Sequence, residues 1–308
     1  MTILAMGAIR PHIVLAPAIA TWPLRLRGCF IITSRSEKNA AKLQIIYEIK
    51  PNKTDSFHMT ILPIQKLLRS GRATAYYTTR ATSSPEEPYS GFNVCHYTGD
   101  DPAHVAQCRR ALAAHFALPA ERVMIPRQTH SSDVAVITAL PAAPSELEGV
   151  DAVVTDMSDI MIGVNTADCV PVVLIDPVAG ISGVAHAGWR GAVGGVVEAT
   201  VGAMVRLGAH PSDIKAAMGP SICCDCFEVG HEVAERFDND CVVMQPGQKP
   251  HVSLQKYVVK VLIGCGLQSD NIKKFDDSLC TRCHPDTFWS ARKSGINSGR
   301  IYTFVVTK

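Results

Sequence analysis

The chain has 308 residues, of which 47% are hydrophobic and 19% charged, and its formal net charge is +2. A chain of this length and composition can bury one sizeable core in one or two domains. The nearly balanced charge excludes the strongly basic footprint of a nucleic-acid-binding protein. The 11 cysteines occur in a long chain without a clear export signal, so we expect reduced thiols and a cytoplasmic location.

Residues 1–58 differ in composition from the rest of the chain. They are apolar and basic with few acids, but Arg10, Pro11, Pro17 and Pro23 interrupt every stretch that is long enough to cross a bilayer. We therefore expect no membrane partner. An organelle transit peptide has a similar composition, and a translation start at Met59 is the plainer alternative. We predict that residues 1–58 are a poorly ordered or absent extension and that residues 59–308 form the functional domain.

Strand and helix patterns begin soon after Met59. Residues 73–79 are rich in Thr and Tyr and predict a strand. Asp100 or Asp101 is placed to cap a helix that has Pro102 in its first turn. Apolar residues then recur at helical spacing and predict the buried face of that helix: Val105, Cys108, Leu112 and Phe116.

The middle of the chain is dense in predicted strands. Short β-branched stretches separated by turns predict strands over residues 134–137, 152–155, 160–164, 170–175 and 181–185. Residues 191–207 have the helical period despite Gly194 and Gly195, and a further helix is expected from near Glu232. This mixture of strands and helices predicts an α/β (α+β) fold class.

Three segments in this region each carry one soft-metal ligand in a turn-like or glycine-rich setting. They are residues 128–131 with His130, residues 166–169 with Cys169, and residues 185–191 with His186. Structural zinc takes four protein ligands and catalytic zinc takes three, so two imidazoles and one thiolate predict a zinc site with an open position. Cys169 precedes one predicted strand and His186 ends the next, which would bring both to one sheet edge. The alternative is that the three residues are unrelated, since buried Cys is common as a small hydrophobic residue and a lone His is usually a hydrogen-bonded polar residue.

Neighbouring residues suggest further roles at this site. Asp168 is a candidate to orient a ligand imidazole or to move a proton, and its plain alternative is to cap a turn. Gly188 and Gly191 place bare backbone near a helix start with Arg190 between them, a common setting for anions such as phosphate. Close packing in a glycine-rich turn is the alternative explanation.

These motifs resemble the YfiH/LACC family, once called laccase-like or multicopper polyphenol oxidases and now regarded as zinc-dependent purine nucleoside phosphorylases that also deaminate adenosine. The resemblance runs from about Ala75 to the C-terminus and is carried by residues 166–169, 186–191, 219–222 and 227–230. It implies a single-domain, four-layer αββα sandwich with mixed sheets. It also implies that His130, Cys169 and His186 hold zinc, with copper as the less favoured metal.

The resemblance further implies a reaction and its residues. The substrates would be phosphate and adenosine, inosine, guanosine or methylthioadenosine, and the products the base and ribose 1-phosphate or its methylthio analogue. Cys169, Asp168 and Arg190 would then be catalytic. Arg80 and Arg292 are candidates for a second cation near phosphate, and Asn93 resembles a family position near the substrate. Surface charges and a turn residue are the corresponding alternatives.

Other functions remain open from the residues alone. Cys169 and His186 can be read as nucleophile and base of a hydrolase, in which case chelation would leave activity intact. A copper-dependent polyphenol oxidase fits less well, because none of the 11 His residues forms a His-x-His pair. A metal-stabilised interaction module would require four ligands and no turnover.

Five further thiols form a separate motif: Cys223, Cys224, Cys226, Cys280 and Cys283. They are candidates for a second, closed zinc site. Residues 280–284 also have the Cys-x-x-Cys-His spacing of a c-type haem attachment site, which would require export.

Overall fold

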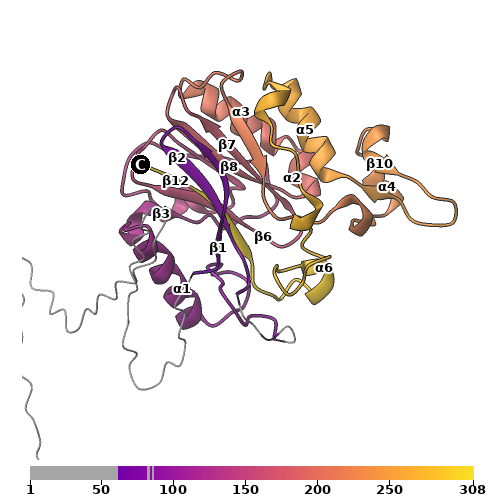
Figure 1. Cartoon of the computed structure of the whole chain (residues 1–308), viewed down its shortest axis with the longest axis horizontal. Helices are drawn as coiled ribbons and strands as arrows, with labels where there is room; N and C mark the ends of the chain where they lie inside the picture. Colours follow the sequence, from indigo (N-terminus) through magenta and orange to yellow (C-terminus); the bar gives the residue numbers. More distant parts are fainter. Residues whose placement is uncertain (1–61, 82–83, 85–86) are drawn as a thin grey trace, which may run out of the picture. The chain divides into compact units, whose positions relative to one another are not determined.

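The computed structural model describes residues 62–308 except 82–83 and 85–86. The predicted extension over residues 1–58 lies outside the described residues. The described part contains two five-stranded sheets and a two-stranded one, with helices against their outer faces (Figure 1). Within it, no helix combines the length and apolar character needed to cross a membrane.

The first sheet has the strand order β1-β2-β12-β6-β3. All of its pairs are antiparallel except β3 with β6. The last strand in the chain, β12, lies in the centre between β2 and β6, and every one of its residues is buried. The strands are β1 (Ile64–Ser70), β2 (Ala73–Thr78), β3 (Val123–Met124), β6 (Met161–Thr166) and β12 (Ile301–Thr307).

The second sheet has the order β4-β5-β8-β7-β9 and holds the candidate ligands. Here β4 and β5 are parallel, and the other pairs are antiparallel. All residues of β7 and β8 are buried, as expected for strands covered on both faces. The strands are β4 (Val134–Ile137), β5 (Ala152–Thr155), β7 (Val170–Asp176), β8 (Ile181–Ala187) and β9 (Lys215–Met218).

The core lies in two layers on either side of the second sheet. Val173 and Val184 face the first sheet, where they pack with residues such as Ile162. Val172 faces the other way, toward α3 (Val196–Arg206) and α5 (Leu254–Gly264). These two helices lie over the second sheet in Figure 1.

The outer face of the first sheet is covered from the other side. Phe116, at the end of α1 (Pro102–His115), lies 5.1 Å from Tyr76 and 5.5 Å from Phe304 between ring centroids. Rings at such distances pack favourably. The order of layers is therefore helix, sheet, sheet, helix, and the four-layer αββα sandwich with mixed sheets is confirmed.

The start of α1 agrees with the sequence pattern. Asp101 is the N-cap, its carboxylate accepts a hydrogen bond from the Ala103 backbone N–H at 2.9 Å, and Pro102 is the first helical residue. This hydrogen bond satisfies one of the donors left free at a helix start, and proline needs none.

Two helix predictions need correction. The helix expected over residues 191–207 is two helices, α2 (Trp189–Val193) and α3, because Gly195 adopts a left-handed φ of 90° and interrupts the hydrogen-bond ladder. The helix expected near Glu232 is the single turn α4 (His231–Ala234). The longer helix in this region is α5, which the sequence analysis did not predict.

The remaining elements are short. They are β10 (Val242–Val243) paired with β11 (His251–Val252), α6 (Ala291–Ser294), and single 3₁₀ turns at Ala120–Arg122, Pro144–Leu147, Cys224–Cys226, Asn239–Cys241, Ser269–Asn271 and Asp277–Leu279.

Candidate metal centre

Pairing of β7 with β8 brings two of the predicted ligands to one sheet edge. Pro171 lies opposite His186, and Cys169 directly precedes β7. His130 joins them from the turn before β4. One ligand atom from each of the three side chains lies within 4.8 Å of the other two, with Cys169 Sγ 3.9 Å from His130 Nε2. The structure therefore brings all three predicted ligands together.

A buried carboxylate that the sequence analysis missed organises this cluster. Asp151 is fully buried at the start of β5, and its Oδ1 lies 2.7 Å from His186 Nδ1. This hydrogen bond fixes the imidazole ring and leaves Nε2 of His186 for a metal. Asp151 is thus the positioning group behind the ligands.

The same carboxylate holds the turn that carries His130. The backbone N–H groups of Thr129, His130 and Ser131 all donate to Asp151, at 3.0, 3.0 and 2.8 Å. His130 has a left-handed φ of 62°, a conformation that costs free energy for a residue with a side chain. Three converging hydrogen bonds to a buried charge stabilise this strained turn and aim the imidazole at Cys169.

The charges in the cluster suit a soft divalent metal. Burial acts to raise the pKa of the Cys169 thiol, but the imidazoles of His186 and His130 outweigh it and lower the pKa to about 6. Burial acts to lower the pKa of His186, whereas Cys169 and Asp151 raise it to about 9. Without a metal, Cys169 is therefore a thiolate near neutral pH beside a protonated His186, and a metal ion that binds the thiolate must displace the His186 proton.

The distances also fit a metal ion. Zinc bonds of about 2.3 Å to sulfur and 2.0 Å to nitrogen place tetrahedral ligand atoms roughly 3.3–3.8 Å apart. The observed 3.9 Å between Cys169 Sγ and His130 Nε2 is close to this separation. Three donors that converge at such distances, with His186 held by a carboxylate, form a site into which one metal ion fits.

The two glycines predicted to bind substrate pack against these ligands. A Cβ on Gly188 would lie 2.9 Å from both Cys169 Sγ and His130 Cδ2. A Cβ on Gly191 would lie 3.0 Å from the carbonyl oxygen of Ser131. Both positions require glycine for close approach of the backbone to the cluster, and their contact with substrate stays a prediction.

If the cluster binds a metal such as zinc, we expect Gly188→Ala to weaken that binding about 10–100-fold, the range seen when groups that position metal ligands are disturbed. The added methyl group can be accommodated only if Cys169 or His130 moves. Titration of metal-free protein with zinc measures the effect. The matched control is Gly264→Ala at the end of α5, where no atom lies within 4 Å of the new Cβ. Equal affinity in both variants would contradict the assignment of these ligands.

Asp168 contacts a different part of the chain from the one predicted. Its Oδ1 accepts a hydrogen bond from Thr281 Oγ1 at 2.6 Å, and its Oδ2 accepts one from the Arg292 backbone N–H at 2.7 Å. The ligand imidazole is oriented by Asp151 instead, which corrects that part of the prediction. A role for Asp168 in proton transfer stays a prediction.

Two of the predicted arginines lie at the surface near the cluster. Arg190 is exposed on α2, with its guanidinium carbon 4.4 Å from the centroid of the Trp189 ring. Arg292 is exposed on α6 and donates from Nη1 to the Glu228 carbonyl oxygen at 2.8 Å. Both guanidinium groups are accessible to an anion from solvent.

Arg80 and Asn93 are buried and make contacts within the protein. Arg80 is only 2% exposed, stacks at 3.9 Å on the Trp289 ring and donates to the Pro285 carbonyl oxygen at 3.0 Å. Asn93 is fully buried and donates to the Asp100 carboxylate at 2.8 Å. Both residues therefore have internal packing partners, and their predicted contact with substrate stays a prediction.

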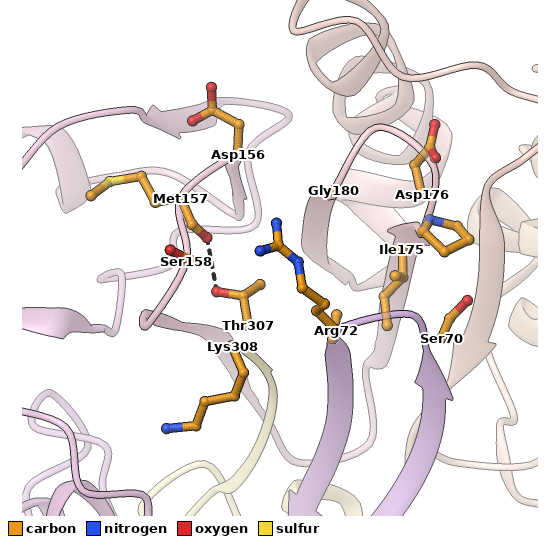
Figure 2. Close-up of a pocket in the computed structure, with 12 residues that line it drawn as sticks. Ser70, Arg72, Asp156, Met157, Ser158, Ile175, Asp176, Gly180, Thr307 and Lys308 are labelled. Atoms are coloured by element: carbon orange, nitrogen blue, oxygen red, sulfur yellow. Dashed lines mark hydrogen bonds between the residues drawn. The ribbon is translucent and has the colours of Figure 1, made fainter.

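Two cavities in the described part of the chain lie away from this centre. A cavity of about 30 Å³ lies at the far end of the β7–β8 hairpin, where Arg72 extends between two loops near Gly180 (Figure 2). It has room for one or two water molecules. A cavity of about 300 Å³ is lined in part by His96 and Arg109. No ligand of the cluster lines either cavity, and His130 is exposed, so the cluster opens to the surface.

Comparison with known proteins places the chain in a family. Residues 74–308 match the model described as multi-copper polyphenol oxidoreductase laccase. The chain is 47% identical over 247 residues, 76% of this chain and 94% of the relative, to "Adenosine deaminase RL5" of an unknown prokaryotic organism. It is 37% identical over 234 residues, 74% of this chain and 87% of the relative, to a purine nucleoside phosphorylase of Deinococcus radiodurans. The crystal structure of the hypothetical protein YfiH from Bacillus licheniformis matches with a TM-score of 0.71 at 27% identity, over 77% of this chain and 93% of that one. The chain therefore belongs to the multi-copper polyphenol oxidoreductase laccase family, the YfiH/LACC family that its motifs resemble.

Proposed function

We propose that this protein is a zinc-dependent purine nucleoside phosphorylase that also deaminates adenosine. Its substrates would be phosphate and adenosine, inosine, guanosine or methylthioadenosine. The observation that carries the proposal is the cluster of His130, Cys169 and His186, three converging donors that open to the surface at His130, in a chain whose relatives are named for these two activities. Three protein ligands leave one coordination position for a reacting molecule.

Phosphorolysis forms a bond from a phosphate oxygen to C1′ of the ribose and breaks the bond from C1′ to N9 of the purine, which leaves with a proton. A bound zinc ion supplies a Lewis acid at the open position. We assign Arg190 and Arg292 to the phosphate charge, because both are exposed and lie on segments that contact the ligands or Asp168. Asp168 is the assigned proton carrier, held in place by Thr281.

Deamination uses water in place of phosphate at the same centre. A bond from the water oxygen forms to C6 of the purine, the bond from C6 to the amino nitrogen breaks, and ammonia leaves with the proton. A carboxylate that accepts a proton from water and passes it to the leaving nitrogen serves this reaction, and Asp168 is again the assigned group. One site can carry out both reactions if the nucleoside binds in two orientations, with C1′ toward phosphate in one and C6 toward water in the other.

Zinc is proposed over copper because of the ligands available. A multicopper oxidase cluster requires many imidazoles, whereas the described residues group only His130 and His186 with a thiolate. The other donor group in the described part of the chain consists of cysteines alone. Neither proposed reaction transfers electrons, so a metal without redox chemistry is sufficient.

Product analysis with and without a chelator tests the proposal. With adenosine and phosphate, we expect adenine and ribose 1-phosphate beside the inosine formed by deamination; without phosphate, we expect inosine alone. Removal of the metal should abolish both products, and added zinc should restore them. Turnover that survives chelation would contradict the proposal and favour a Cys169 hydrolase. Restoration by copper alone, with oxidation of phenols, would favour a polyphenol oxidase.

A further inference from the structure

The second donor group lies in two loops that are distant in the sequence. Cys223 and Cys226 follow β9, and Cys280 and Cys283 precede α6. The four Sγ atoms all lie within 4.8 Å of one another, and Cys226 Sγ is 3.4 Å from Cys283 Sγ. Four sulfurs around one tetrahedral zinc ion, bonded at about 2.3 Å, stand roughly 3.8 Å apart. The observed separations between sulfur atoms, from 3.4 Å up to 4.8 Å, therefore include the separation expected around a single zinc ion.

The backbone forms a tight turn at each Cys-x-x-Cys pair. The Cys226 N–H donates to the Cys223 carbonyl oxygen at 3.2 Å, and the His284 N–H donates to the Cys280 carbonyl oxygen at 3.1 Å. Across the two turns, the Cys223 N–H donates to Cys280 Sγ at 3.3 Å. A hydrogen bond from the backbone to a ligand sulfur stabilises the negative charge that a thiolate carries when it binds a metal.

Further backbone hydrogen bonds hold the two loops together. The Ser221 N–H donates to the Leu279 carbonyl oxygen at 3.2 Å, and the Thr281 N–H donates to the Ser221 carbonyl oxygen at 3.1 Å. These bonds form a parallel bridge between Ser221 and Cys280. The convergence of the four thiols thus follows from the fold and does not depend on flexible side chains alone.

We propose that Cys223, Cys226, Cys280 and Cys283 bind one zinc ion in a closed structural site. Each sulfur lies near all three others, whereas disulfides would use the thiols as two separate pairs. Multi-iron clusters hold their thiolates on different iron atoms, and those thiolates stand farther apart than ligands of one ion. Four thiolates fill a tetrahedral site and leave no position for substrate, so this ion is structural and distinct from the three-ligand centre.

The proposed zinc site lies next to the two segments that donate hydrogen bonds to Asp168. Ile222, next to Cys223, donates from its N–H to the Asp168 carbonyl oxygen at 2.9 Å. Thr281, next to Cys280, donates from Oγ1 to the Asp168 carboxylate at 2.6 Å. One zinc ion therefore joins both partners of Asp168 and, through it, orders the turn that carries the ligand Cys169.

Metal analysis of full-length variants tests the proposal. In the variant His130→Ala/Cys169→Ala, which lacks the other centre, we expect about one zinc per chain by mass spectrometry. Addition of Cys226→Ser and Cys283→Ser should reduce the zinc to background and lower the Tm by roughly 5–10 °C, as for loss of a tightly bound ligand. The matched control is Cys224→Ser in the same loop, whose sulfur lies outside the group of four and which should keep its zinc.

A second measurement does not depend on folding of the serine variants. In the same His130→Ala/Cys169→Ala protein, the exposed Cys283 should resist alkylation while zinc is bound and react after chelation. Cobalt substitution should give the intense visible absorption of a tetrahedral thiolate complex. Absence of zinc, iron in its place, disulfides among the four thiols, or alkylation unaffected by chelation would each overturn the proposal.

Discussion

The variant Cys169→Ala is expected to lose both of the proposed activities, phosphorolysis and deamination. The thiolate is the only anionic donor among the three ligands, so its removal leaves two neutral imidazoles, too few to retain zinc against competing water. Loss of the side chain from a partly buried position leaves the strand pairing of β7 with β8 intact, and the fold should persist. Activity assays with metal analysis on the same sample measure the outcome.

A cysteine outside both clusters provides the control. Cys265, directly after α5, is also partly buried, and Cys265→Ala should retain zinc and activity. Comparison of the two variants separates loss of a ligand from loss of any thiol. Full activity in Cys169→Ala would show that the thiolate is dispensable and would refute the three-ligand centre.

The variant Asp151→Ala is expected to be the most destabilising at the site. It removes the acceptor for the Thr129, His130 and Ser131 backbone N–H groups and for the His186 imidazole. Removal of one partner from a buried charged network costs about 3–5 kcal/mol. The left-handed turn at His130 would also lose the hydrogen bonds that offset its strain. Denaturant unfolding measures the loss of stability.

A milder substitution separates stability from metal positioning. Asp151→Asn keeps the volume but turns an amide N–H toward groups that are themselves donors, so zinc affinity should fall about 10–100-fold. The control is Asp133→Asn, an exposed carboxylate in the same segment. Zinc affinity in Asp151→Asn equal to that of the control would show that Asp151 supports the fold without positioning the ligands.

The strands of the second sheet could be predicted closely because burial on both faces leaves a strong pattern. The predicted limits 134–137 and 152–155 are those of β4 and β5, and β7 and β8 extend one and two residues past the predicted ends. The ligand cluster could also be predicted, since Cys169 and His186 flank two consecutive strands and consecutive strands commonly pair.

Asp151 could not be predicted because its role depends on contacts across the fold. Its partner His186 is 35 residues away, and the two meet only because β5 pairs with β8. The sequence offered one indication of its burial, since Asp151 directly precedes a stretch of four apolar or β-branched residues that form a buried strand. In the same way, Arg80 is buried against Trp289, which lies on a distant segment of the chain. Because most arginines are exposed, the local sequence alone predicts a surface position for Arg80.

The central position of β12 delays completion of the first sheet. Residues 301–307 pair with β2 on one side and β6 on the other, across separations of more than 130 residues. During synthesis, β2 and β6 emerge early and must wait with unpaired edges until these residues leave the ribosome. Exposed edges of buried strands attract other chains, so nascent or truncated products of this protein are predicted clients of chaperones. Completion of the first sheet therefore depends on residues synthesised more than 130 positions after its strand β6.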